Sequence, residues 1–392
     1  MFRSYLLKIL LFLIPGIGFL LLNYLFLRNT GELLSLPKLV QRQQTDSGSC
    51  VYGTAIHDDT FYYKLEEYAY RKPDVAVLGS SRVMQLQEDF FSGSFFNFGG
   101  SMSSINKGEQ LFRSMIARHK PKLILVGIDF WWFNSQFAAV KYSDHLFPPQ
   151  SRFQLKYLFE PVSFLFQGKI SISRYVRTLL HPPFPPAGDL CCIGVSACFT
   201  GVGYDPDGSY EYGNMLIGKA PENADEKFAD TINRIRTGSN RFEYADRVDS
   251  THWAHFLNFV HDMQAEGTEV VLYFPPLAPT AYREIDRERT HYGYFAELRQ
   301  LLHQANLTFY DFEDPSTIST IDCEFIDGFH SGAVTSARLL LTMAQIDPKV
   351  RPFVDTRALQ QIISQNQGKA TVEDPRVMTD HEVDFLNIGC KK

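Results

Sequence analysis

The feature that most constrains the fold of this chain is an alternation between short apolar runs and amphipathic helical patterns. The runs read DVAVLG, FFNFGG, KLILVGID, TEVVLYF and LTFYDF. KLILVGID is nearly all apolar, as expected of a strand buried on both faces of a sheet. Helical patterns such as SINKGEQLFRSMIARH and THWAHFLNFVHDMQAEG separate the runs, and strands alternating with helices form right-handed β-α-β units. We therefore predict an α/β fold, a three-layer sandwich around a parallel sheet of roughly five strands.

The amino-terminal segment predicts a membrane anchor. Residues 9–27 read ILLFLIPGIGFLLLNYLFL, and as a helix this run spans about 28 Å, close to the hydrocarbon thickness of a bilayer. Pro15, Gly16 and Gly18 are tolerated in a membrane span. No small-x-small site follows the run, so we expect an uncleaved anchor rather than a signal peptide. We expect a single-pass protein of the inner (cytoplasmic) membrane, with residues 1–8 cytoplasmic and the soluble body on the periplasmic or extracellular side.

The rest of the chain divides by composition into three parts. Residues 28–70 read as a stem and lead-in, and residues 71–347 hold the strand and helix alternation. The alternation is interrupted at about 135–245 by Pro- and Gly-rich sequence, which we interpret as an insertion or cap beside the sheet. Residues 348–392 form a polar C-terminal extension with one helix near 356–365.

The charge balance argues against nucleic acid as a partner, and the cysteines indicate the compartment of the soluble body. The chain has 38 Lys and Arg against 44 Asp and Glu, so it lacks the basic excess with which proteins bind nucleic acid. Cys191, Cys192 and Cys198 lie close together, and we expect Cys198 to form a disulfide with one of its neighbours in an oxidising compartment. Cys50 and Cys323 either pair with each other or remain free.

Three segments place reactive groups at the carboxyl ends of predicted strands, where ligands gather in an open parallel sheet. The run VAVLGSSR ends near Ser81, where we predict that a helix begins and continues through Phe90. A serine at such a junction exposes its hydroxyl, and the helix amino end favours a developing oxyanion. The run FFNFGG ends in Gly99 and Gly100, whose backbone N–H groups can approach a ligand closely.

The third segment is Asp327-Gly328-Phe329-His330, and a predicted helix follows it. A turn can bring Asp327 against one ring nitrogen of His330, while the other ring nitrogen faces a serine hydroxyl. We therefore predict a catalytic site formed by Ser81, His330 and Asp327. We expect no metal and no cofactor, because no cluster of ligands at metal spacing accompanies these residues.

Together these segments resemble the SGNH/GDSL hydrolase superfamily, in particular its membrane-anchored branch that modifies cell-envelope polymers, which includes D-alanyl transfer and alginate-acetylation proteins. The resemblance covers approximately residues 72–129 and 269–345. The family's Gly-Asp-Ser is similar to Gly79-Ser80-Ser81, its Asp-x-x-His to Asp327 and His330, and its second block to FNFGGS.

The resemblance implies an SGNH/flavodoxin-like sheet and a serine acyltransferase or esterase that acts on acyl esters of cell-envelope polysaccharide. It implies Ser81 as the nucleophile, with backbone N–H groups of Ser81 and of Gly99 or Gly100 forming the oxyanion hole. It also implies an envelope polysaccharide or other acyl acceptor as one partner and a membrane-bound O-acyltransferase as another.

The third family block departs from the pattern. The family's Gly-x-Asn-Asp is replaced by Gly127-Ile128-Asp129-Phe130, which lacks the Asn donor, and Asn134 lies too late to replace it. This departure argues against an ordinary lipase and is compatible with the acyl-transfer branch. It also supports an alternative, a non-catalytic, membrane-tethered binding or assembly subunit on the same scaffold.

Four further residues are candidates for binding substrate: Arg82, Asp129, Trp131 and Trp132. Arg82 either binds an anionic group or faces solvent at the start of the predicted helix. The two tryptophans follow the third strand, where they either line the mouth of the site as a platform for an acyl group or sugar or pack in the core.

Overall fold

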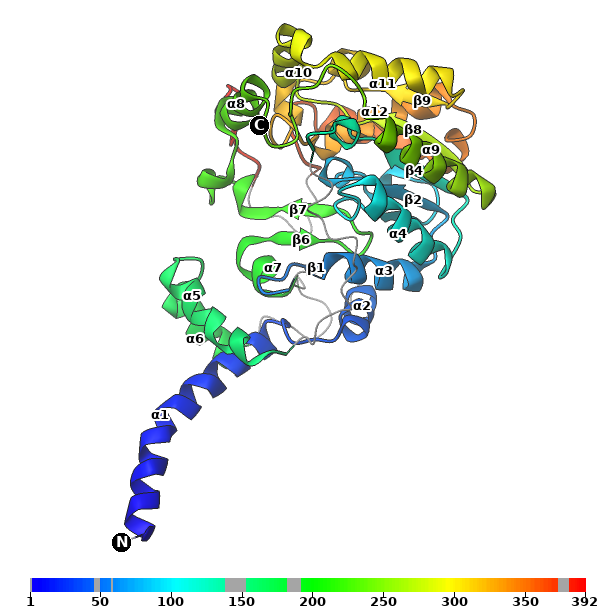
Figure 1. Ribbon diagram of the computed structural model, residues 1–392. Helices are drawn as coiled ribbons and strands as arrows, with labels where there is room; N and C mark the ends of the chain where they lie inside the picture. Colours follow the sequence, from blue (N-terminus) through cyan, green and yellow to red (C-terminus); the bar gives the residue numbers. More distant parts are fainter. Residues whose placement is uncertain (1, 46–49, 58, 138–152, 182–191, 373–380) are drawn as a thin grey trace. The chain divides into compact units, whose positions relative to one another are not determined.

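The computed structural model describes the chain except for residues 1, 46–49, 58, 138–152, 182–191 and 373–380, and divides it into two compact units (Figure 1). The N-terminal unit comprises Met1–Tyr63, Phe147–Pro206 and Glu211–Gly213. The sheet unit comprises Lys64–Leu146, Asp207–Tyr210 and Asn214–Lys392. Much of the segment interpreted as an insertion beside the sheet is therefore a partner of the N-terminal region.

The sheet unit is built on five parallel strands. Their order is β3-β2-β4-β8-β9, with bounds β2 (Val75–Leu78), β3 (Phe95–Asn97), β4 (Leu123–Gly127), β8 (Glu269–Phe274) and β9 (Phe309–Asp311). Counted along the chain this is the order 2-1-3-4-5, one of the two common doubly wound orders. All five strands correspond to the apolar runs of the sequence, so the prediction of a five-stranded parallel sheet is confirmed.

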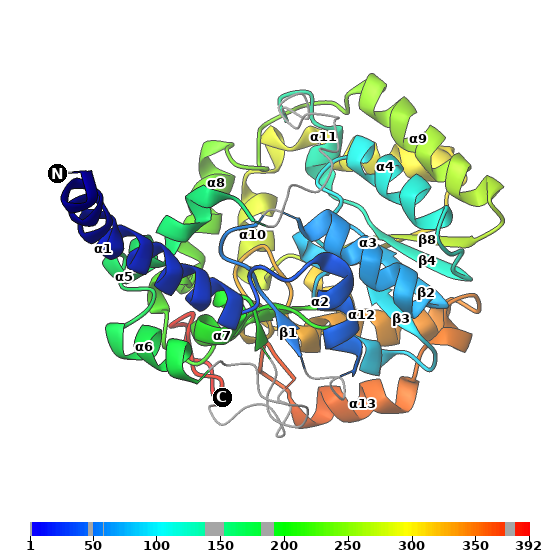
Figure 2. The ribbon, with the colours of Figure 1, turned by 90° about the horizontal axis from the view of Figure 1, so that it is seen from below.

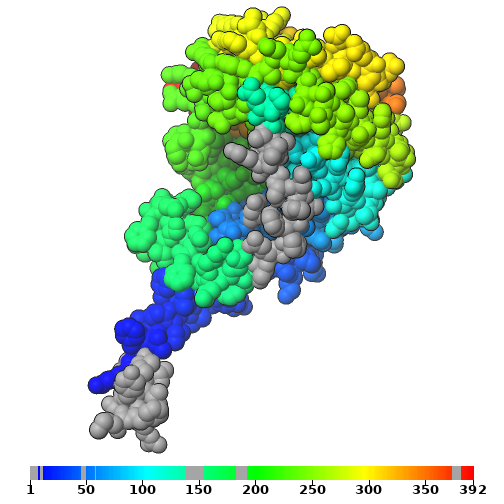
Figure 3. Space-filling view, in the orientation of Figure 1, coloured from blue at the N-terminus to red at the C-terminus, as the bar shows by residue number. Residues whose placement is uncertain are grey.

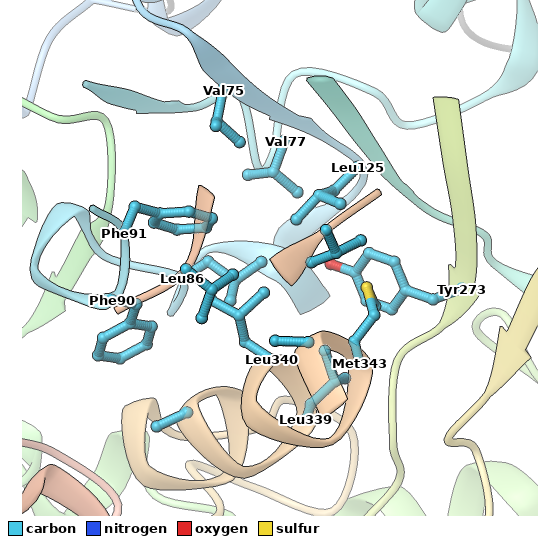
Figure 4. Packing of buried hydrophobic residues seen from close by; sticks show 14 of the residues in the cluster. Val75, Val77, Leu86, Phe90, Phe91, Leu125, Tyr273, Leu339, Leu340 and Met343 are labelled. Atoms are coloured by element: carbon cyan, nitrogen blue, oxygen red, sulfur yellow. The ribbon is translucent and has the colours of Figure 1, made fainter. Parts of the chain in front are cut away.

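Helices cover both faces of this sheet (Figure 2). The α-helices with residues in this unit are α3 (Thr60–Arg71), α4 (Ile105–Ile116), α8 (Ala229–Thr237), α9 (Ser250–Ala265), α10 (Pro279–Arg287), α11 (Gly293–Gln304), α12 (Ala333–Ile346) and α13 (Thr356–Gln365). On one face, alternate strand side chains such as Val77 and Leu125 pack against Leu340 and Met343 of α12 (Figure 4). On the other, Phe112 of α4 and Phe259 of α9 place their rings 6.3 Å apart.

The C-terminal extension belongs to this core. The predicted helix near 356–365 is α13, and its Leu359 is fully buried in the cluster beneath α12. Farther along, the carbonyl of Ala370 accepts a hydrogen bond from the N–H of Ala333 at 2.6 Å. A disulfide joins Cys323 to Cys390. The C-terminal extension therefore holds the start of α12 in place. This helix begins three residues after His330.

The N-terminal unit contains a second, smaller sheet of order β5-β1-β6-β7. Its elements are α1 (Phe2–Asn29), α2 (Leu36–Thr45), β1 (Val51–Tyr52), α5 (Glu160–Phe166), α6 (Ile172–Leu180), β5 (Cys192–Ile193), α7 (Val195–Thr200), β6 (Val202–Tyr204) and β7 (Tyr210–Tyr212). Buried Glu32 accepts hydrogen bonds from the N–H groups of Ala55 and Val195 at 2.9 and 2.8 Å. Residues 28–63 are thus part of a folded unit rather than a stem.

The predicted anchor lies within α1. This helix is long and apolar enough to cross a membrane, and the most apolar part that the structure describes is Phe12–Asn29. Pro15 is accommodated inside the helix. The apolar run of residues 9–27 therefore forms one continuous helix, as predicted.

The disulfides follow the sequence prediction in part. Cys198 pairs with its neighbour Cys192, as expected, whereas Cys191 lies outside the described residues. Cys323 neither remains free nor pairs with Cys50, because its partner is Cys390. Cys50 is also disulfide-bonded. Such cross-links are typical of proteins in oxidising compartments.

The Cys323–Cys390 disulfide should contribute strongly to the stability of the sheet unit, because it closes a loop with a sequence separation of 67. We expect the Cys323→Ser/Cys390→Ser variant to lose up to about 4 kcal/mol of unfolding free energy. Urea unfolding of the full chain in detergent, followed by tryptophan fluorescence, measures this loss, since all 3 tryptophans lie in the sheet unit. The Cys192→Ser/Cys198→Ser variant is the control, and equal losses in both variants would contradict the expectation.

Candidate active site

The end of β2 presents Ser81 at the carboxyl edge of the sheet. The strand stops at Gly79, where a Cβ would lie 2.9 Å from the methyl groups of Val83. The hydroxyl of Ser80 accepts the N–H of Arg82 at 3.2 Å and begins a short 3₁₀ turn, η1 (Ser81–Val83). The predicted helix from Ser81 through Phe90 is wrong: two 3₁₀ turns, η1 and η2 (Glu88–Phe90), replace it. The turn positions the hydroxyl but provides no long helix dipole.

The three predicted catalytic side chains come together. The hydroxyl of Ser81 lies 2.8 Å from Nε2 of His330, and Nδ1 of the same ring lies 2.7 Å from Oδ2 of Asp327. Ser81 is separated from His330 by 249 positions in the sequence, so the fold of the sheet unit brings the two together. The arrangement is that of a nucleophile, a base and the group that orients the base.

Asp327 is held as a carboxylate by its own turn. Its Oδ1 accepts the backbone N–H groups of Phe329 and His330 at 2.7 and 2.6 Å, which leaves Oδ2 for the imidazole. Burial alone would raise the pKa of Asp327, but the imidazole and the two N–H donors hold that pKa below its ordinary value. The Asp327 carboxylate therefore accepts a hydrogen bond from His330 without taking its proton, and its negative charge stabilises positive charge on the ring.

The side chain of Phe329 packs this turn against the core. It is 1% exposed, and its ring lies 5.1 Å from the ring of Trp131 and 5.1 Å from the guanidinium of Arg82. The side chains of Arg234 and Arg241 also approach the same ring. A large buried aromatic between Asp327 and His330 limits the motion of the loop that carries both.

The turn after β3 decides between the two predicted glycine donors. Asn97 is buried, donates to the carbonyls of Val83 and Leu86, and accepts the N–H of Gly99 at 2.6 Å. That N–H is therefore occupied. Within the described part of the chain, the N–H groups of Gly100 and Ser81 donate to no acceptor, and Gly100 is exposed. Of the two glycines, Gly100 is the one with an available donor.

A buried lysine fixes the orientation of that donor. Lys64 is 0% exposed, and its Nζ donates to the carbonyls of Asn97, Gly99 and Gly208 at 3.0, 2.6 and 2.8 Å. The carbonyl of Gly99 and the N–H of Gly100 belong to one trans peptide, so they point in opposite directions. Because the carbonyl faces inward to Lys64, the N–H of Gly100 faces away from the core.

The electrostatics of Lys64 follow from its position. Burial lowers the pKa of its ammonium group well below the ordinary value, and the nearby Asp207 carboxylate raises it. Three carbonyl oxygens match the three donors of an ammonium group. Sequence analysis missed this residue because a lysine within FYYKLEEYAYR reads as a solvated helix face, and lysines are rarely fully buried.

Arg82 and Asp129 form a buried ion pair beneath the site. Their side chains are 0% and 1% exposed, with Nη1 and Oδ1 3.4 Å apart, and Arg82 also donates to the carbonyl of Pro275. The prediction that Arg82 binds an anionic substrate group or faces solvent is wrong, because its partner is the buried carboxylate of Asp129, which is itself closed off from solvent. The pair instead ties the turn after β2 to the ends of β4 and β8.

The tryptophans belong to the core. Trp131 and Trp132 are 1% and 2% exposed, on the 3₁₀ turn η3 (Phe130–Phe133) after β4. They are not a platform at the mouth of the site. Asn134 does not replace the family's missing donor, because its amide donates to the carbonyl of Glu243. Among the residues that the structure describes, no group of His, Cys, Asp or Glu side chains is suited to hold a metal ion.

No family model matches the chain, and no curated protein matches it.

Burial raises the pKa of Asp129 to about 6, although Arg82, Ser80 and Arg241 act to lower it. Between pH 3.8 and about 6, the Asp129 carboxyl is protonated in the folded state and ionised in the unfolded chain. The unfolding free energy therefore falls as pH rises through this window. Relative to Asp129→Asn, we expect the wild-type unfolding free energy to fall by roughly 3 kcal/mol across it. Urea titrations of the full chain at several pH values measure the unfolding free energies of wild type and Asp129→Asn, and the exposed Asp262→Asn is the control for lost charge. If the free energy of wild type minus that of Asp129→Asn stays constant or grows with pH, the expectation is contradicted.

Proposed function

We propose that the protein is a membrane-anchored serine acyltransferase or esterase of the SGNH type, acting on acyl esters of cell-envelope polysaccharide. The observation that carries the proposal is the continuous hydrogen-bonded line from the Ser81 hydroxyl through His330 to Asp327, with distances of 2.8 and 2.7 Å. A turn serine at the end of a parallel strand and an Asp-x-x-His turn before a helix are also what the resemblance to that superfamily implies.

The first half of the reaction forms an acyl-enzyme. His330 Nε2 takes the proton of Ser81 as Oγ attacks the carbonyl carbon of an ester or thioester. The carbonyl oxygen becomes an oxyanion, and His330 then gives its proton to the departing alcohol or thiol as the bond from carbon to the leaving group breaks. In the second half, His330 Nε2 takes the proton of a sugar hydroxyl or water as its oxygen attacks the acyl carbon. His330 then gives that proton to Ser81 Oγ as the bond from the acyl carbon to Oγ breaks.

The oxyanion would lie between the N–H groups of Ser81 and Gly100. Within the described residues, neither N–H donates to an acceptor. Because the carbonyl of Gly99 points inward to Lys64, the N–H of Gly100 points outward. Lys64 contributes twice, because it fixes the peptide plane and its charge polarises the peptide whose N–H is the donor. Donors that are fixed before the reaction need no reorganisation in the transition state.

The remaining features support a place at the membrane. The helix α1 is long and apolar enough to span a bilayer, and disulfides in both units favour an oxidising compartment. We therefore place the catalytic unit on the periplasmic or extracellular side of the inner membrane. A membrane-bound O-acyltransferase as the source of acyl groups is what the resemblance to the superfamily implies.

The triad predicts the rates of single variants in hydrolysis of p-nitrophenyl acetate by the detergent-solubilised full chain. Ser81→Ala and His330→Ala should lower kcat by on the order of 10⁴-fold or more, and Asp327→Asn by about 10⁴-fold. Ser80→Ala is the matched control, because the Ser80 hydroxyl is occupied by the N–H of Arg82 rather than by the imidazole. Equal rates in wild type and all variants would remove the catalytic proposal and favour a non-catalytic binding subunit.

The oxyanion-hole assignment predicts a separate effect of Lys64. Lys64→Met should lower kcat roughly 10- to 100-fold with little change in KM, because the affected donor acts on charge that exists only in the transition state. The control is Lys122→Met, which removes a 67% exposed lysine paired with Asp74 in the same unit. A rise in KM at constant kcat would show that Lys64 acts only on substrate binding.

A further inference from the structure

The most exposed apolar surface outside α1 lies on one short stretch of the N-terminal unit, which we call the α5–α6 face. It comprises residues 153–180, which contain the 3₁₀ turn η5 (Leu155–Phe159), α5 and α6. Its large exposed side chains, with their exposed fractions, are Phe153 (46%), Leu155 (64%), Phe159 (54%), Phe166 (88%), Ile172 (74%), Val176 (45%) and Leu180 (70%). So many exposed apolar side chains on adjacent turns mark an interaction surface rather than ordinary surface variation.

The helix α6 has one broad apolar face, and α1 covers only part of it. On the covered side the ring of Tyr175 stacks on Phe26 with centroids 4.8 Å apart. On the adjoining side Ile172, Val176 and Leu180 recur every four residues and form one exposed stripe. An apolar face that is only half covered within its own unit indicates another partner for the exposed stripe.

That partner is indicated by the continuity between the α5–α6 face and the exposed surface of α1. The ring of Phe159 lies 6.0 Å from that of Phe19, and Phe153 lies 6.2 Å from Tyr24. In Figures 1 and 3 the α5–α6 segment lies beside the later turns of α1, within the same unit. The same surroundings that cover α1 would therefore also meet this face.

The depth along α1 is consistent with the edge of a bilayer. From Asn23 onward the helix is partly covered by protein: Asn23 accepts the hydroxyl of Tyr175 at 2.8 Å and Phe26 and Leu27 are fully buried, while Tyr24 stays 38% exposed. The part of α1 before Asn23 that carries no charged side chain, residues 9–22, is about 21 Å long and covers about two thirds of a hydrocarbon core of roughly 30 Å. The remaining thickness falls at the level of the α5–α6 face, which therefore lies at the outer boundary of the hydrocarbon.

The charges on this stretch have one dominant sign. Residues 153–181 contain Lys156, Lys169, Arg174 and Arg177 but a single acid, Glu160. All four cations are exposed, and Arg174 among them donates to the carbonyls of Phe199 and Cys198. Apolar side chains flanked by lysine and arginine fit the boundary between acyl chains and anionic phosphate headgroups.

We propose that the α5–α6 face lies in the surface of the lipid bilayer beside α1, as a second membrane contact in the outer leaflet. The apolar stripe enters the acyl-chain boundary, and Lys156, Lys169 and Arg177 lie among the headgroups. The proposal rests on the proposed single-span anchor. Its consequence for function is that the N-terminal unit is held against the membrane by two elements instead of swivelling on one helix.

The test uses the full chain in phosphatidylcholine nanodiscs, with an environment-sensitive fluorophore on one introduced cysteine. Phe166→Cys and Ile172→Cys report on the α5–α6 face, Phe12→Cys on the anchor, and Ile346→Cys, at a 57% exposed position of the sheet unit, on solvent. We expect the first three probes to show blue-shifted emission that lipids brominated in the acyl chains quench, and the fourth to show neither. Adding phosphatidylglycerol should strengthen the quenching at Phe166 and Ile172, and Lys169→Gln/Arg177→Gln should remove that gain.

The outcomes separate this proposal from the anchor on which it rests. Quenching at Phe12 without quenching at Phe166 and Ile172 would overturn the proposal while leaving the anchor intact, and would assign the face to a protein partner. Absence of quenching at Phe12 would remove the anchor and the proposal together. The p-nitrophenyl acetate assay bears on catalysis independently of either result.

Discussion

The structure of the site depends on the turn from Asp327 to His330. One carboxylate oxygen satisfies two backbone N–H groups of that turn, and the other holds the imidazole. The same contacts keep the carboxylate ionised and orient the ring toward Ser81. The Phe329 side chain secures the turn against the core, and α12 begins just beyond it. A local hydrogen-bonding unit of four residues thus supplies the base, its orientation and its charge stabilisation.

Buried charges hold the other two edges of the site. The Arg82–Asp129 pair connects the end of β2 with those of β4 and β8, and Lys64 gathers three carbonyls around the turn after β3. Burying these charged groups costs free energy, and among the described residues Nε of Arg82 has no hydrogen-bond partner. The buried charges nevertheless hold the ends of the strands and the turn after β3 in place, and donors that are fixed in advance stabilise an oxyanion without reorganisation. The third donor that the resemblance implies is replaced by a structural acid, so two N–H groups would form the oxyanion hole.

The sequence predicted the parts of this protein that depend on local pattern. Five apolar runs became the five strands, and the serine, histidine and aspartate predicted at strand ends lie within hydrogen-bond distance in the order Ser81, His330, Asp327. Features that depend on long-range packing were not predictable. The two-residue strands β1 and β5 carry too little periodicity to be recognised, and nothing in the sequence around Lys64 or Arg82 indicates that either is buried. The expected helix after Ser81 failed because Asn97 bonds the carbonyls of Val83 and Leu86.

The central claim is that His330 activates Ser81 for attack on an acyl carbon. Its most direct test is reaction of the full chain with a fluorophosphonate, followed by peptide mass spectrometry to locate the adduct. The account predicts that the wild-type chain carries one phosphonyl group, on Ser81. It also predicts that His330→Ala loses nearly all labelling. An adduct on another residue, or labelling of His330→Ala equal to wild type, would contradict it.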